Sequence, residues 1–168
     1  RLWVDNYFQT AIFPVLTPLA VDPAHPFPFV SNLSLNVAAL IDDPDTGQRL
    51  LARVKVPQTI LPRFVAIPVD LADEESETVH TAVPLEQVVA FNLGLLFPGM
   101  SIEGHYFFRV TRDADLELRD LEADDLMIAI EQGLRKRRMG GEVVRLEVAE
   151  GMPQDVVEML MDGMSVEE

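Results

Sequence analysis

Basic side chains are the residues of this sequence whose types and spacing could do chemistry, and that chemistry is anion binding. Arg109 and Arg112 lie on an aromatic segment, and Arg53 and Lys55 lie on a stretch with strand periodicity. The densest group is a run of four consecutive residues: Arg135, Lys136, Arg137 and Arg138. Cationic side chains bind phosphate through charge-assisted hydrogen bonds. We therefore take Arg109, Arg112 and the run at 135–138 as candidate anion contacts. Whether Arg53 and Lys55 lie near these candidates is left open.

The run at 135–138 also has a purely structural explanation. It lies at the C-terminal end of a predicted helix, where cations stabilise the helix dipole by about 0.3–1 kcal/mol per charge. The same dipole repels phosphate, whereas a helix N-terminus attracts it. We favour the structural explanation and keep anion binding as the alternative.

The three histidines and the glycines give no recognisable catalytic motif. His25, His80 and His105 are scattered, without the short spacing of metal ligands. His25 could act as a nucleophile or general base in principle, but a structural or surface role is favoured because catalysis needs positioned partners. His105 alternates with core residues and is expected to be packed or at a rim. Gly140 and Gly141 follow a predicted helix instead of opening one, so they do not form a phosphate loop. The sequence predicts no catalytic residue and no metal ligand.

Composition narrows the class of protein further. The chain has 168 residues and no cysteine, which indicates one domain without disulfides, a cysteine nucleophile or an iron–sulfur cluster. The formal net charge of −15 would repel a nucleic acid, so no nucleic-acid partner is expected. The acidic stretch 70–77 could hold a divalent cation, but a solvated face is favoured. No run approaches the roughly 18 apolar residues of a membrane helix.

Hydrophobic spacing and turn residues predict the elements that position these side chains. We expect a helix at 1–12 that stops by Phe13, because the residue before Pro14 disfavours helical geometry. The proline-rich stretch 13–31 is expected to be a rigid, extended segment pinned against a surface, since its prolines exclude a helix and an interior strand. The further expected elements are a hairpin of strands 33–41 and 50–56 with a turn at 42–47, strands at 63–69 and 79–83, a helix from Pro84 to 96, a strand at 104–113, a helix at 121–139, a strand at 142–149 and a helix after Pro153. This order predicts an α+β (α/β mixed) single domain, with a mixed, largely antiparallel sheet and helices packed against it.

The segment FPVLTPLAVDPAHPFPFVSNLSLN at 13–36 resembles bacterial polyphosphate kinases of the first family, in which a similar stretch opens the middle, or head, domain. Three further segments agree in order: VPLEQVVAFNLGLLFPGM at 83–100, FFRVTRDAD at 107–115 and LRKRRMGGEVVRLEV at 134–148. On this resemblance, and because the chain starts at Arg1, we expect an excised domain. Residues 1–12 would be an entry helix or the end of a preceding helical segment. Residues 13–162 would be the middle domain, and 163–168 the start of a linker to C-terminal domains.

The resemblance implies an activity for the parent enzyme. Enzymes of this family reversibly transfer the terminal phosphate of ATP to inorganic polyphosphate, with Mg²⁺, through a phosphohistidine. The histidine and the main nucleotide and metal ligands belong to other domains, so this chain is expected to bind neither ATP nor Mg²⁺ and to be inactive alone. Its implied role is structural, with the other domains of the same chain and a second subunit as partners. The stretch 13–29 and the last helix are candidate contact surfaces. The alternative is a polyphosphate- or nucleotide-binding module that uses the local arginines and lysines. A cytoplasmic location is implied, with peripheral association at a membrane left open.

Overall fold

The structure, a computed structural model, describes residues 2–21, 26–68, 81–113 and 141–166. The chain divides into two compact units, of which the first consists of residues 1–25 and 35–107 and the second of residues 26–34 and 108–168. Strand β6 (Ser101–Arg112) belongs to both, because the boundary between the units falls within it.

The first unit begins with the helical segment that was predicted for residues 1–12. It comprises α1 (Leu2–Tyr7), a π-helical turn η1 (Phe8–Ile12) and a 3₁₀ turn η2 (Phe13–Val15). Phe8 and Ile12 are fully buried, as the apolar spacing predicts. Trp3 and Tyr7 stack with their ring centroids 5.3 Å apart.

The prediction that helical geometry stops by Phe13 is wrong. Phe13 has φ −52° and ψ −43°, and the 3₁₀ turn continues through Pro14 to Val15. Pro14 lies at the start of this short turn, where its missing N–H would have had no helical partner. The restriction that proline places on the preceding residue is a preference and not a rule. Here the Leu16 N–H donates to the Phe13 carbonyl at 3.2 Å, which closes the 3₁₀ turn.

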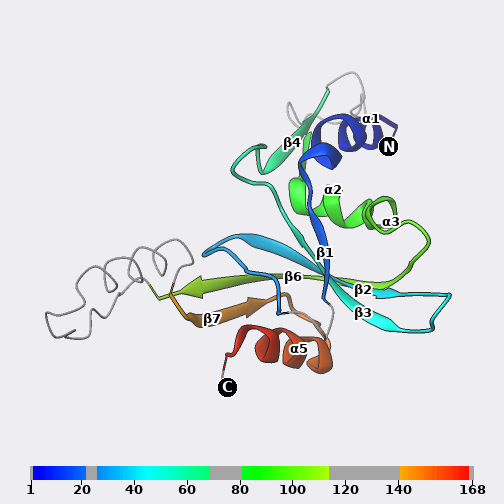
Figure 1. Ribbon diagram of the computed structural model, residues 1–168. Helices are drawn as coiled ribbons and strands as arrows, with labels where there is room; N and C mark the ends of the chain where they lie inside the picture. The colour runs from blue at the N-terminus through cyan, green and yellow to red at the C-terminus, as the bar shows by residue number, and fades with distance from the viewer. Residues whose placement is uncertain (1, 22–25, 69–80, 114–140, 167–168) are drawn as a thin grey trace, which may run out of the picture. The chain divides into compact units, whose positions relative to one another are not determined.

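A five-stranded sheet has the order β1-β3-β2-β6-β7. Strands β2 (Leu35–Asp42) and β3 (Arg49–Lys55) form the predicted antiparallel hairpin, drawn in blue to cyan in Figure 1. Strand β1 (Pro18–Val21) lies at the edge beside β3. An edge is where a proline-containing strand fits, because proline cannot donate a ladder hydrogen bond. Part of the predicted extended segment is therefore an edge strand.

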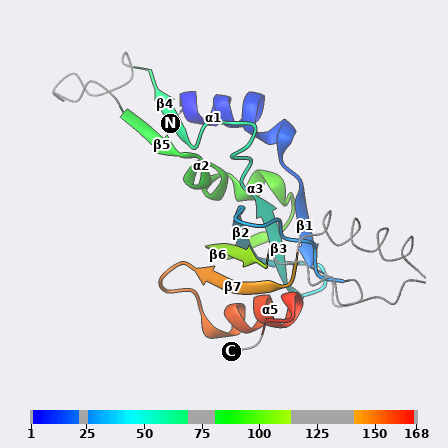
Figure 2. The ribbon, with the colours of Figure 1, turned by 90° about the vertical axis from the view of Figure 1, so that its left-hand side faces the viewer.

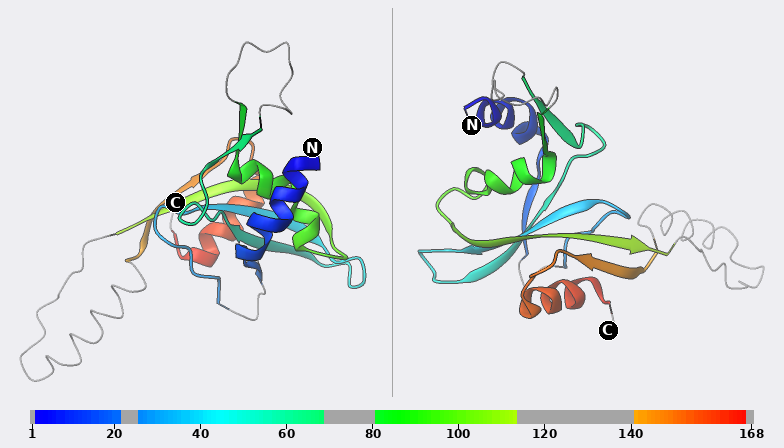
Figure 3. Two further views of the ribbon diagram at one scale, coloured as in Figure 1. Left: turned by 90° about the horizontal axis from the view of Figure 1, so that it is seen from above. Right: turned by 180° about the vertical axis from the view of Figure 1, so that it is seen from behind.

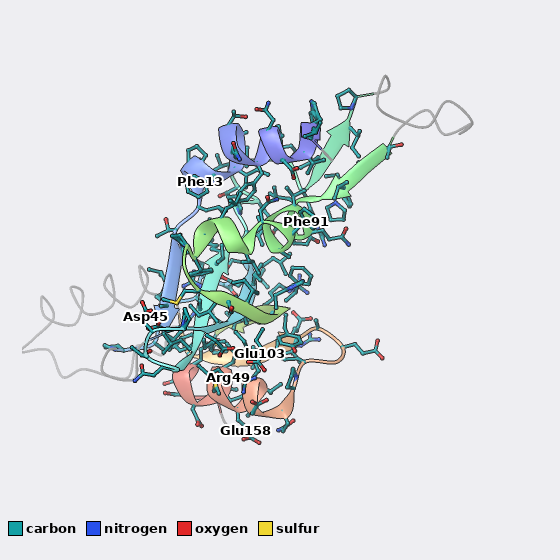
Figure 4. The ribbon with its side chains drawn as sticks, turned by 90° about the vertical axis from the view of Figure 1, so that its right-hand side faces the viewer. Phe13, Asp45, Arg49, Phe91, Glu103 and Glu158 are labelled. Carbon is teal, nitrogen blue, oxygen red and sulfur yellow. The ribbon has the colours of Figure 1, made fainter. Side chains whose placement is uncertain are left out.

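Both faces of the hairpin are buried. On one face Val37 pairs with Val54 and Ala39 with Ala52, and all four join the main hydrophobic cluster of the first unit. On the other face Ala38, Leu40, Leu51 and Arg53 are also buried. At the turn end of the hairpin Arg49 on β3 and Glu103 on β6 form a two-pronged ion pair, with N–O distances of 2.6 and 3.2 Å (Figure 4).

The predicted helix from Pro84 to residue 96 is present but divided. It consists of α2 (Leu85–Phe91) and α3 (Leu93–Leu96), and Pro84 ends a strand instead of being the first helical residue. Asn92 separates the two helices, and its side-chain amide donates to the Val88 carbonyl at 2.9 Å. The predicted apolar stripe is confirmed, since its members are buried in the cluster that also holds Phe8 and Ile12: Leu85, Val88, Val89, Leu93 and Leu96. These helices and α1 lie on one side of the hairpin (Figure 1).

Strands β4 (Phe64–Ile67) and β5 (Thr81–Pro84) form a separate two-stranded antiparallel ribbon in the first unit (Figure 2). Both strands were predicted, but the sequence pattern did not indicate that they pair with each other.

The second unit is built on the pairing of β6 with β7 (Val143–Val148) and on helix α5 (Gln154–Met164). All three elements were predicted, and α5 runs alongside β7 in Figure 3. The interior side chains of this unit are fully or almost fully buried: Val30, Phe108, Val110, Val156 and Leu160. The helix predicted at 121–139 lies outside the described residues. The predicted fold class, α+β with a mixed, largely antiparallel sheet and packed helices, is confirmed.

Candidate functional site at the Arg112 junction

Arg112, at the end of β6, joins three segments of the second unit. Its Nε donates to the Val30 carbonyl at 2.7 Å, and its Nη1 donates to the Gly141 carbonyl at 2.8 Å. Its guanidinium carbon lies 4.5 Å from the centroid of the Phe29 ring, a cation–π arrangement. Its backbone N–H donates to Asn32 Oδ1 at 2.8 Å. Burial lowers the pKa of Arg112, but an arginine stays charged throughout the physiological range.

The proline-rich stretch is held against the second unit by further contacts around this junction. The Leu33 N–H donates to the Val110 carbonyl at 2.9 Å, and Leu33 itself has a φ of +58°. Phe27 packs so closely on helix α5 that a Cβ atom added to Gly163 would lie 2.7 Å from Cγ of the phenylalanine ring. The prediction that this stretch is pinned against a surface is confirmed for residues 27–33.

At Gly141 a second pair of segments lies in close contact at the junction. A Cβ on this residue would lie 2.9 Å from the Asp113 carbonyl carbon, which is backbone and cannot move aside like a side chain. The Asp113 N–H also donates to the Glu142 carbonyl at 2.9 Å. Gly141 therefore permits β6 and the residues before β7 to meet at Arg112, and the sequence prediction had given it no such role.

Arg109 lies on β6 with an exposed guanidinium. It makes a two-pronged ion pair with Glu147 on β7, with N–O distances of 2.7 and 3.1 Å. Arg145 contacts the same carboxylate at 3.2 Å, so two cations share one anion on this face. The hydrogen bond from Arg109 lowers the pKa of Glu147, and the same bond raises the pKa of Arg109. Sequence reasoning missed Arg145, although period-two spacing places it on the same strand face as Glu147.

The Arg109–Glu147 pair has a testable pH dependence. Because the pKa of Glu147 in the folded protein lies below its ordinary value, its ionisation contributes stability above that ordinary value, and the contribution is lost as the pH falls through the lowered pKa. We expect Arg109→Ala to move the Glu147 pKa upward, as measured by NMR titration of the side-chain carboxyl. Arg145→Ala is the matched control and should move it less, because Arg145 acts only through its charge. An equal shift of the Glu147 pKa in both variants would contradict the role given to the Arg109 hydrogen bond.

The other predicted residues belong to the first unit or lie outside the described residues. Arg53 and Lys55 belong to β3 in the first unit, where Arg53 is only 7% exposed and donates to Asn36 Oδ1 at 2.9 Å. The run at 135–138, His25 and His80 lie outside the described residues. His105 is exposed on β6, with its ring 6.0 Å from that of Phe107 in an edge contact, which is the predicted rim position.

The described junction is suited to holding backbone segments in place and not to catalysis. Nε and Nη1 of Arg112 are bonded to backbone carbonyls, and Arg109 is bound to a carboxylate. Within residues 2–21, 26–68, 81–113 and 141–166, no three histidine, aspartate or glutamate side chains gather as a metal site would require. These described residues therefore offer no ready-made cage of side-chain ligands for a metal ion.

Residues 1–168 match the family model of the polyphosphate kinase middle domain. The chain belongs to this family. A polyphosphate kinase of Prochlorococcus marinus (strain MIT 9313) is 79% identical over 168 residues, covering 100% of this chain and 24% of the relative. One of Parasynechococcus marenigrum (strain WH8102) is 76% identical over 166 residues, covering 99% of this chain and 23% of the relative. The polyphosphate kinase middle domain described here thus spans about a quarter of the length of these relatives.

The fold of this middle domain also occurs in a solved structure. The crystal structure of polyphosphate kinase from Porphyromonas gingivalis superimposes with a TM-score of 0.73 and 23% identity, over 99% of this chain and 22% of that one. At this identity the likeness concerns the fold. No helix in the described part of the middle domain is long and apolar enough to cross a membrane.

Proposed function

We propose that this chain is the structural, noncatalytic middle domain of a polyphosphate kinase. The parent enzyme would reversibly transfer the terminal phosphate of ATP to inorganic polyphosphate, and its phosphohistidine would lie outside these residues. The observation that carries the proposal is that a family model of the middle domain matches the whole chain, while relatives named polyphosphate kinase are about four times as long. Most of such an enzyme therefore lies beyond this sequence.

The described arginines are bound to other parts of the same chain, which supports a structural role. The two-pronged pairs of Arg49 and Arg109 and the carbonyl contacts of Arg112 use guanidinium groups to join segments of the chain. Phosphoryl transfer depends on cations and metal ions placed around the phosphate. A domain of net charge −15 that uses Arg49, Arg109 and Arg112 to join its own segments is poorly suited to that task alone.

The proposal includes the wider organisation of the enzyme. Residues 13–162 would form the middle domain, 1–12 its entry helix and 163–168 the start of a linker, in a cytoplasmic enzyme that uses ATP and Mg²⁺ in its other domains. The partners would be those domains, a second subunit and polyphosphate. Exposed apolar side chains on the proline-rich stretch and α5 support contact surfaces there: Phe13 45%, Leu19 39%, Phe29 45% and Met159 41% exposed.

A labelling experiment tests this role. The 168-residue chain, incubated with ATP radiolabelled at the terminal phosphate and with Mg²⁺, is expected to incorporate no stoichiometric acid-labile phosphate and to make no polyphosphate. The full-length enzyme serves as the positive control. Labelling that disappears in His105→Asn would contradict the proposal, because His105 would then be a nucleophile. Salt-sensitive binding of polyphosphate that weakens in Arg145→Ala would instead favour the alternative, a polyphosphate- or nucleotide-binding module.

A further inference from the structure

The β4–β5 ribbon has one face on the core and one apolar face in solvent. Val65 is 2% exposed and belongs to the main cluster, against which Val83 also packs. On the opposite face Phe64 pairs with Pro84 and Ala66 with Ala82. Phe64 is 61% exposed, and both alanines are exposed. A two-stranded ribbon is marginally stable by itself, so an entirely apolar outer face is unusual unless something covers it.

A carboxylate with an unfilled hydrogen-bonding position lies beside this face. Glu86, on α2, is 9% exposed as a residue. Its Oε1 accepts from Arg63 Nη2 at 3.0 Å, whereas its Oε2 is buried and has no hydrogen-bond partner. Arg63 directly precedes β4, its carbonyl accepts from the Leu85 N–H at 2.7 Å, and its guanidinium lies 5.8 Å from the centre of the Phe64 ring. The Arg63–Glu86 pair therefore lies at the margin of the outer face.

The two features together indicate what the surface would bind. An ionised oxygen without a donor is unfavourable in a buried position, and such groups usually have a partner. A covering segment would need apolar side chains for the ribbon face and an N–H donor for Glu86 Oε2. The Glu86 side chain is buried, whereas the Arg63 side chain is 59% exposed. We therefore expect Arg63 to be the side chain that moves when a donor reaches Glu86 Oε2.

We propose that the outer face of the β4–β5 ribbon and Glu86 form a docking site for another part of the same polyphosphate kinase polypeptide, an apolar segment that carries an arginine, lysine or amide donor. The inference rests on the proposed function, because it requires that the chain belong to a longer enzyme. These relatives are about four times as long as this chain, so the rest of such a polypeptide can provide the segment that covers the face. The carboxylate repels anions and needs a donor at Oε2, so it disfavours a phosphate dianion as the ligand.

Hydroxyl-radical footprinting of the full-length enzyme tests the site, because the chain offers a matched pair of residues. Phe64 and Phe91 are 61% and 60% exposed in this domain, and Phe91 is the last residue of α2 and belongs to neither strand of the ribbon. We expect Phe64 to be oxidised severalfold more slowly than Phe91 in the full-length enzyme. Equal rates, or faster oxidation of Phe64, would overturn the proposal.

Two further measurements identify the occupant. Glu86→Gln replaces an acceptor by a mixture of donor and acceptor, and it should raise the oxidation rate of Phe64 severalfold while leaving that of Phe91 unchanged. An unchanged Phe64 rate in this variant would overturn the role of Glu86. Loss of Phe64 protection on dilution to the monomer would show that a second copy covers the face, which would overturn the intramolecular assignment. None of these outcomes alters the phosphate-labelling result, so the two proposals can fail separately.

Discussion

Gly163→Ala should destabilise the protein, although alanine is a better helix former than glycine. Overpacking of a filled interior costs about 1–3 kcal/mol, and a Cβ on Gly163 would overlap the Phe27 ring, with Cγ only 2.7 Å away. The intrinsic helix preference for alanine recovers at most about 1 kcal/mol. We therefore expect a net loss of about 1–2 kcal/mol in the free energy of unfolding, measured by chemical denaturation.

A matched control separates packing from helix propensity. Gly94 lies in α3, and a Cβ there would meet nothing within 4 Å, so Gly94→Ala should be neutral or slightly stabilising. The double variant Phe27→Leu with Gly163→Ala should lose less stability than the sum of the two single variants, because the smaller side chain leaves room for the methyl group. If Gly163→Ala stabilised the protein as Gly94→Ala does, the packing of Phe27 on α5 would be contradicted.

Arg112→Met should have the largest effect of the substitutions considered. Methionine keeps much of the apolar stem but removes both hydrogen bonds to the Val30 and Gly141 carbonyls and the contact with Phe29. Hydrogen bonds that involve a charged group contribute about 1.5–3 kcal/mol each. Since the two carbonyls can regain some water, we expect a loss of about 3 kcal/mol in the free energy of unfolding, with increased hydrogen exchange at the Leu33 N–H, which bonds to Val110.

Two comparisons make this prediction specific to the geometry of the guanidinium. Arg112→Lys keeps the charge but cannot direct donors to two carbonyls in a fixed fork, so it should rescue little stability. Arg109→Ala removes an exposed ion pair on the same strand and should cost much less stability, because solvent screens such a pair. A loss for Arg112→Met no greater than that for Arg109→Ala would contradict the role of Arg112 as the junction of three segments.

Local pattern was sufficient to predict most of the elements. Alternation of apolar residues located β2, β3, β6 and β7, and the apolar stripe from Leu85 to Leu96 located two helices that Asn92 divides. The turn between β2 and β3 was also predictable, because Asp43 bonds to Asp45 and Thr46, only two and three residues away. These features depend on neighbours in sequence, so spacing alone predicts them. Partner choice was not predictable in the same way, and nothing in β4 or β5 indicated that they form their own ribbon.

The candidate site shows the limit of sequence reasoning most directly. Arg112 was selected as an anion contact because arginine binds phosphate, but in the structure its Nε and Nη1 bond to carbonyls 82 and 29 residues away. Every residue has a carbonyl, so neither Val30 nor Gly141 carries a sequence signal that it will receive a guanidinium. The free oxygen of Glu86 and the contact of Phe27 with Gly163 are equally nonlocal. The sequence by itself determined the family resemblance, the charge and the elements, because these depend on residue types and local spacing. Only the tertiary structure decided which arginines are engaged internally and which apolar face stays open, because those properties depend on contacts between distant segments.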